Sequence, residues 1–272
     1  DDLPGSTIPL INGVARGDLD VIMEIWTANP AQAWVDAEKA GQVVALGTTF
    51  PDAIEGWFVP KYLVDGDSAA APSLKQVSDL PEYAEMFTDP EEPSKGRFYN
   101  CPAGWQCEIV NSKKLVAYGL ADSYTNFRPG TGAALAAAVN SAYLREKPIL
   151  FYYWAPTALM GQHDFVQLQE PAFNREIWDQ MMASDDPQSA TAYPVSKVII
   201  GANKTFSESA PNLTAFLTAY TTTSDLTSKA LADMEANGGD ADMAAKTFLK
   251  AHEDVWTKWV PASVAEKVKA AL

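Results

Sequence analysis

The chain has 272 residues, of which 47% are hydrophobic and 20% are charged. This composition is ordinary for a folded globular protein, excludes extended disorder, and allows one large domain or two medium ones. The 35 acidic and 20 basic residues give a formal net charge of −15, and such a surface repels nucleic acid and anionic lipid. No apolar run reaches the roughly 18 residues of a membrane span.

Short apolar runs and helix-end signals define the elements of the first half of the chain. Apolar runs predict buried strands, a glycine after a periodic run ends a helix, and Ser or Asp side chains cap helix starts. In chain order they predict a turn or helix end at Gly13–Asp18, a strand at Asp20–Ile25, a helix at Ala31–Ala40, strands at Val43–Leu46 and Trp57–Leu63, helix starts within Ser73–Phe87, and a polar loop at Thr88–Gly96.

The second half continues the alternation of helices and strands. The patterns predict helices at Asn111–Leu120 and Thr131–Glu146, a strand at Ile149–Tyr153, loop over Phe165–Ala192 with a short helix near Arg175–Met182, a strand at Lys197–Gly201, and helices from Pro211, at Ser224–Ala236 and at Ala241–Val260. Alternating strands and helices favour an α/β fold with largely parallel sheets. Because no low-complexity linker occurs, two lobes would be joined by crossing strands, for which Trp57–Leu63 and Tyr193–Gly201 are the candidates.

Both cysteines lie in one short segment, Cys101-Pro-Ala-Gly-Trp-Gln-Cys107. A disulfide needs Cα atoms within about 4.4–6.8 Å, which so short a separation permits, and the bridge would fix the enclosed Trp105. The spacing is not the Cys-x-x-Cys of a thioredoxin site, and no histidine lies nearby to complete a zinc site. We therefore predict a Cys101–Cys107 disulfide, an oxidising compartment and no metal.

Catalytic signatures are weak throughout the sequence. The chain has two histidines, His163 and His252, and neither stands near a nucleophile in the sequence pattern. No serine lies in a Gly-x-Ser-x-Gly elbow, and Gly130-Thr-Gly132 lacks the third glycine and the preceding strand of a dinucleotide loop. We predict that the protein is not an enzyme, with no catalytic residue and no cofactor.

Three tryptophans differ from the rest in their sequence context. Trp26, Trp105 and Trp154 lie at strand–loop junctions beside proline or glycine, whereas Trp34 and Trp256 fit apolar helix faces. Core packing is the default for tryptophan, but ligands of α/β sheets bind beyond the carboxyl ends of strands. Spacing alone leaves both interpretations open. If the three indoles line a pocket, they suit a quaternary ammonium group, which aromatic faces recognise by cation–π attraction.

Several motifs, which follow one another along the chain in a consistent order, resemble those of the glycine betaine-binding proteins of ABC importers. The resemblance rests on Cys101 with Gly104–Glu108, on Phe151–Pro156, on Tyr193–Ser196 followed by Ala202–Lys204, and on Gly17–Asp20 with Trp26-Thr27. It implies a periplasmic, two-lobed binding protein of type II-like fold, in which each lobe is a mostly parallel sheet flanked by helices. Such a receptor closes over its ligand in the cleft between the lobes and delivers it to a membrane permease. We expect a monomer.

The resemblance also implies the lobes and the ligand. We place lobe I at residues 1–57 and 195–272 and lobe II at 58–194. Relatives begin with a strand–helix–strand unit, and the resemblance implies that this sequence starts just after it, so that either the sequence is truncated or the first lobe is built differently. Glycine betaine is the first choice of ligand; trimethylamine N-oxide, choline, carnitine and dimethylsulfoniopropionate are alternatives, as is an enzyme acting on such a compound.

The family's aromatic box maps onto Trp26, Trp105 and Trp154, and the amides of Gln106 and Cys107 are implied to hold the ligand carboxylate, as anion-binding amides do.

Four further positions bear on the polar end of the ligand and on the box. Pro30 stands where relatives often carry a carboxylate-binding histidine, and Asn29 is a candidate substitute. Glu108 is expected to add a repulsive or water-bridged interaction with a carboxylate, and Trp57 is a weaker fourth candidate for the box.

Overall fold

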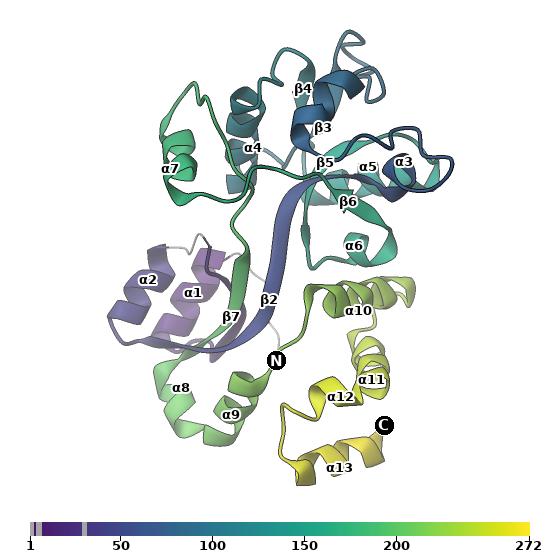
Figure 1. Ribbon diagram of the computed structural model, residues 1–272. Helices are drawn as coiled ribbons and strands as arrows, with labels where there is room; N and C mark the ends of the chain where they lie inside the picture. Colours follow the sequence, from purple (N-terminus) through teal and green to yellow (C-terminus); the bar gives the residue numbers. More distant parts are fainter. Residues whose placement is uncertain (1–2, 4–6, 29–31) are drawn as a thin grey trace. The chain divides into compact units, whose positions relative to one another are not determined.

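The computed structural model describes residue 3 and residues 7–28 and 32–272 (Figure 1). By its internal contacts the chain divides into two compact units: unit 1 comprises residues 1–53, 156–158 and 195–272, and unit 2 comprises residues 54–155 and 159–194. The sequence placed residues 54–57 in the first lobe. By contact they group with unit 2, because from Ile54 onward their strand pairs with residues 151–155.

Unit 1 is built on three strands in the order β1–β7–β2. They are β1 (Val21–Trp26), β7 (Ser196–Asn203) and the first part of β2 (Val43–Pro60). β7 pairs antiparallel with both neighbours, since β2 leaves the unit and β7 returns to it in the opposite direction. Apolar side chains of α1 (Thr7–Arg16) and α2 (Gln32–Lys39) pack with those of β1 and β2 in one cluster.

The remaining helices of unit 1 follow β7. They are α8 (Lys204–Ser209), α9 (Pro211–Ala219), α10 (Ser224–Ala236), α11 (Ala241–Ala251), α12 (Glu253–Trp256) and α13 (Ala262–Ala271). Trp256 and Trp259 are buried in an apolar cluster with side chains of α9, α11 and α13. Among the described residues, no helix is both long and apolar enough to cross a membrane.

Unit 2 contains a sheet that is covered on both faces. Its strands are the second part of β2, β5 (Leu150–Ala155), β3 (Gly96–Tyr99) and β4 (Tyr124–Phe127) in that order, with β6 (Phe165–Gln167) also paired to β2. Side chains alternate along a strand, so Tyr152 of β5 joins one apolar cluster with α4 (Gln106–Ala117), whereas Phe151 and Tyr153 join another with α5 (Gly132–Leu144).

Shorter helical elements complete unit 2. They are α3 (Lys61–Val64), the 3₁₀ helix η1 (Val77–Tyr83), α6 (Ala158–Gln162) and α7 (Arg175–Ala183). The predicted strand Trp57–Leu63 ends at Pro60, where α3 begins, because proline lacks the amide N–H that the ladder needs.

The α/β class and the division into two units agree with the predicted fold, but the expectation of mostly parallel sheets was wrong. Among the pairings of the described strands, β3 is parallel to β4 and β5, and the other pairs are antiparallel. The sequence also missed several elements, namely α1, β3, β4, α6, β6, α8 and α13. Most of them are short, and a run of three or four strand residues gives little period-2 signal.

Gly47 of β2 permits a close approach of α9. A Cβ atom at this position would lie 2.4 Å from the carbonyl oxygen of Leu217 and 2.9 Å from that of Thr218. Because backbone atoms cannot swing aside, we expect Gly47→Ala to lower the free energy of unfolding by about 1–3 kcal/mol. Gly130→Ala is the control, since no atom lies within 4 Å of its Cβ position. Urea denaturation of both variants tests this, and equal stabilities would contradict it.

Candidate functional site

The predicted disulfide is present and shapes the loop before α4. Cys101 and Cys107 are bonded, with their Cα atoms 6.0 Å apart. Within the loop, the amide of Trp105 donates to the carbonyl of Pro102 at 3.3 Å, and Gly104 has φ +90°. A turn with positive φ at its third residue favours glycine there. The bridge and the turn therefore set the direction in which the chain presents Trp105.

A buried polar network anchors the first residue of the loop. The Oδ1 atom of Asn100 accepts from the amide of Cys101 at 2.6 Å and from Nδ2 of Asn111 at 2.8 Å. Both asparagines are fully buried. Oδ1 of Asn111 in turn accepts from Nε1 of Trp57 and from the hydroxyl of Tyr193, each at 2.8 Å. Satisfied buried networks rigidify their surroundings, so this one ties the loop to the core of unit 2.

Two of the predicted box residues meet in unit 2. The rings of Trp105 and Trp154 form an edge-to-face pair with centroids 5.6 Å apart. Trp154 is half-buried near the end of β5 and stacks on Tyr153 at 4.6 Å, whereas Trp105 is 40% exposed. A Cβ atom on Gly132, the first residue of α5, would lie 2.9 Å from Cη2 of Trp105. Glycine at this position therefore leaves the room that the indole occupies.

The first residues of α4 follow Trp105 directly. Gln106 and Cys107 open the helix, and Trp105 at the N-cap supplies no side-chain acceptor to them. Amides in the first turn of a helix have no partner within the helix and favour an anion. Next in the chain, the Glu108 carboxylate forms an ion pair with Nε of Arg128 and accepts from Ser112 at 2.9 Å. The positive charge of Arg128 offsets the repulsion that the sequence predicts for Glu108.

The other predicted site residues lie elsewhere. Trp26 ends β1 in unit 1, where its half-buried ring packs against Phe50, Ala53 and Val198. Asn29 lies outside the described residues. Trp57 has no exposed surface, and its ring lies 4.3 Å from that of Phe98. Trp57 is therefore a core residue in this structure, and the prediction that it is a fourth member of the box is corrected.

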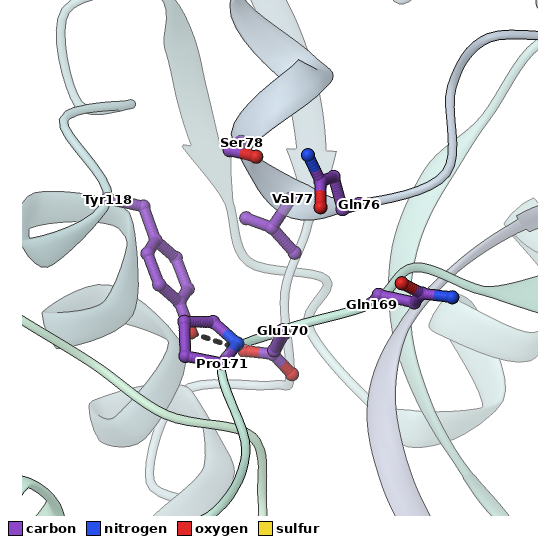
Figure 2. A pocket seen from close by; sticks show the side chains of 7 residues that line it. All are labelled: Gln76, Val77, Ser78, Tyr118, Gln169, Glu170 and Pro171. Atoms are coloured by element: carbon purple, nitrogen blue, oxygen red, sulfur yellow. Dashed lines mark hydrogen bonds between the residues drawn. The ribbon is translucent and has the colours of Figure 1, made fainter.

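Unit 2 also holds a cavity of about 250 Å³, shown in Figure 2, that no predicted site residue lines. Its lining residues are Gln76, Val77, Ser78, Tyr118, Gln169, Glu170 and Pro171. As Figure 2 shows, the Tyr118 hydroxyl donates to Oε1 of Glu170, at 2.9 Å. The same oxygen accepts from the buried ammonium of Lys114 at 2.7 Å. Burial lowers the pKa of Lys114, and the nearby Glu170 carboxylate partly opposes that shift.

Several residues around the indole pair were missed by the sequence. They are Asn100, Asn111, Arg128, Gly132 and Tyr152, of which Tyr152 alone lies within a motif that carries the family resemblance. Asn100 directly precedes the cysteine loop, and this adjacency was a usable signal. The others depend on long-range packing that a single sequence does not encode as a pattern.

The chain is similar in fold to solved substrate-binding proteins of ABC transporters. A glycine betaine/L-proline-binding protein (ProX) from Borrelia burgdorferi has a TM-score of 0.62 at 19% identity, covering 96% of this chain and 86% of that one. A lactococcal OpuAC complexed with glycine betaine also has a TM-score of 0.62, at 18% identity, covering 94% and 85%. These likenesses establish the two-lobed α/β fold.

The family follows from the sequence match. The model of OpuAC, the substrate-binding domain of ABC-type glycine betaine transport systems, matches residues 2–251, and the chain belongs to this family. A glycine betaine/proline betaine-binding periplasmic protein of Escherichia coli is 29% identical to this chain, in a match that covers 75% of this chain and 64% of the Escherichia coli protein. The glycine betaine-binding protein OusX of Dickeya dadantii is 27% identical over 93% of this chain and 77% of its own length. The family that the motifs indicated is confirmed.

The disulfide should hold the indole pair more than it holds the fold. A loop this short gains only about 2 kcal/mol of stability from its bridge, so the Cys101→Ser/Cys107→Ser variant should fold and unfold at moderately lower urea. Its near-ultraviolet circular dichroism should lose the signal of the Trp105–Trp154 pair. The same cysteine change in a Trp105→Phe background is the control. An equal spectral change there would show that the signal has another origin.

Proposed function

We propose that this protein is the periplasmic receptor of an ABC importer and captures a small methylated ammonium compound, with glycine betaine as first choice. The observation that carries the proposal is the edge-to-face pair of Trp105 and Trp154, held by the disulfide loop and by β5. Quaternary ammonium groups have no N–H to donate in a hydrogen bond and are bound by aromatic faces. Family membership supports the same ligand class.

We assign the cationic head to a box of Trp26, Trp105 and Trp154. Trp26 belongs to unit 1 and the other two tryptophans belong to unit 2. A carboxylate or other polar oxygen would accept hydrogen bonds from the amides of Gln106 and Cys107, where the helix N-terminus favours negative charge. Asn29 is proposed as a further donor.

The proposed partner is a membrane permease, to which a monomeric receptor delivers the ligand. The names of the curated relatives, which are glycine betaine-binding periplasmic proteins, support this assignment. Catalysis on the bound compound receives no support from the histidines. Nε2 of His163 is hydrogen-bonded to Asn140 at 2.6 Å, with its ring stacked on Tyr143, and the ring of His252 lies 4.8 Å from that of Phe248.

A ligand panel tests the function directly. Glycine betaine, trimethylamine N-oxide, choline, carnitine and dimethylsulfoniopropionate are titrated by calorimetry and by thermal shift. A true ligand at about 100 times its dissociation constant should stabilise the fold by about 2.7 kcal/mol. Pro30 stands where relatives often carry a carboxylate-binding histidine. The affinity for glycine betaine should therefore be less than about a hundredfold higher than the affinity for trimethylamine N-oxide. No binding by any of the five compounds would overturn the proposed function.

Alanine variants test the box. A desolvated cation–π contact contributes about 2 kcal/mol, so Trp26→Ala, Trp105→Ala and Trp154→Ala should each weaken affinity by roughly one to two decades. Trp178→Ala removes a half-buried indole outside the proposed box and is the matched control. Circular dichroism confirms that each variant is folded. Normal binding by all three folded box variants would show that these tryptophans are packing residues.

A further inference from the structure

Glu55 occupies the position opposite Trp154 in the sheet of unit 2. The antiparallel pairing of β2 with β5 sets Glu55 against Trp154 and Trp57 against Tyr152. Directly opposed residues of such a pair lie on the same face, with Cβ atoms about 4.5–5.5 Å apart. A half-buried carboxylate is therefore the cross-strand neighbour of a tryptophan of the proposed box.

One hydrogen bond holds the carboxylate of Glu55, and another holds its backbone. The Tyr152 hydroxyl donates to Oε1 of Glu55 at 2.6 Å, and the Tyr152 ring lies 6.2 Å from that of Trp154. On the other side of β2, Nε2 of Gln167 donates to the backbone oxygen of Glu55 at 3.1 Å. Glu55 is thus connected to the indole of Trp154 both by strand register and through Tyr152.

The charges around Glu55 do not balance. Lys114 attracts Glu55 and Glu170, and it forms its ion pair with Glu170 at 2.7 Å. Burial raises the pKa of the facing tyrosines, Tyr118, Tyr152 and Tyr193, so they are neutral. One ammonium therefore faces two carboxylates. Burial also raises the pKa of Glu55, although the Tyr152 hydrogen bond and Lys114 oppose that shift.

We propose that Glu55 is a specificity-determining residue of the ligand site, whose carboxylate supplies the negative charge that selects a permanently cationic head group beside Trp154. This inference rests on the proposed function of the same site. A methylated ammonium offers no N–H for a direct hydrogen bond, so Glu55 acts through space, in surroundings where burial strengthens charge–charge attraction. Aromatic faces alone also bind neutral tert-butyl groups, and a carboxylate adds discrimination that depends on charge.

Glu55→Gln isolates the charge, because the glutamine side-chain oxygen can still accept from Tyr152. Calorimetric titrations at pH 8 use glycine betaine, choline and the neutral choline isostere 3,3-dimethylbutan-1-ol. We expect the variant to bind glycine betaine and choline about tenfold more weakly, equivalent to about 1.4 kcal/mol, with little change for the neutral alcohol. Glu82→Gln removes an exposed carboxylate of η1 in the same unit and should leave affinities within about twofold.

The pH profile supplies a readout that a structural role would not change. The cation binds best when Glu55 is ionised, so affinity of the wild type should fall as pH drops through the Glu55 pKa, and Glu55→Gln should remove this dependence. Tyr152→Phe removes the hydrogen-bond donor that favours ionised Glu55. In this variant, affinity for the cation should therefore begin to fall at a higher pH than in the wild type. This variant also tests the proposal if Glu55→Gln does not fold.

Three outcomes are decisive. Weaker binding of the two cations with unchanged binding of the neutral alcohol supports the inference. Glycine betaine binding that is equal in wild type and Glu55→Gln, or a Tyr152→Phe profile that coincides with that of the wild type, overturns it and leaves the proposed function intact. A wild type that binds none of the methylated ammonium compounds overturns the proposed function, and this inference with it.

Discussion

Burial of strand β5 on both faces is the constraint on which the candidate site depends. Alternate side chains of Leu150–Tyr153 enter two separate apolar clusters, one with α4 and one with α5. If a strand fixed in this way shifted its register by one residue, the side chains that now enter each cluster would turn to the opposite face of the sheet. The packing therefore sets the register. Trp154 follows this run directly, so the packing of the preceding residues determines its position. The same pairing sets Glu55 opposite Trp154 on β2.

The second indole is held by local covalent and hydrogen-bonded restraints. The disulfide, the turn at Gly104 and the Asn100–Asn111 network each limit the motion of the loop that carries Trp105. Preorganisation of this kind raises affinity, because less conformational entropy is lost when the ligand is bound. Trp154, which lies on the sheet, and Trp105, which lies in the loop, thus meet edge to face. Strand packing positions the first, and the disulfide loop positions the second.

Charge acts on two length scales in this protein. The formal net charge of −15 creates a field that extends over about a Debye length and influences the approach of any cation. Inside unit 2, Lys114 is paired with Glu170 at 2.7 Å and is also attracted by Glu55, and the surrounding protein screens these charges less than water does. Near α4, Arg128 instead neutralises Glu108 and keeps the start of that helix suited to an anionic or dipolar oxygen.

The sequence by itself determined the features that depend on near neighbours: the Cys101–Cys107 bridge, the helix Ser224–Ala236, and the motifs that identify the family. Tertiary structure decided the strand directions, the burial of Trp57 and the pairing of Glu55 with Tyr152, whose partners are 97 positions apart. The physical reason is that caps, turns and short loops are encoded by adjacent residues. Strand register and burial depend on which distant segments pack together, and a single sequence does not state that pairing.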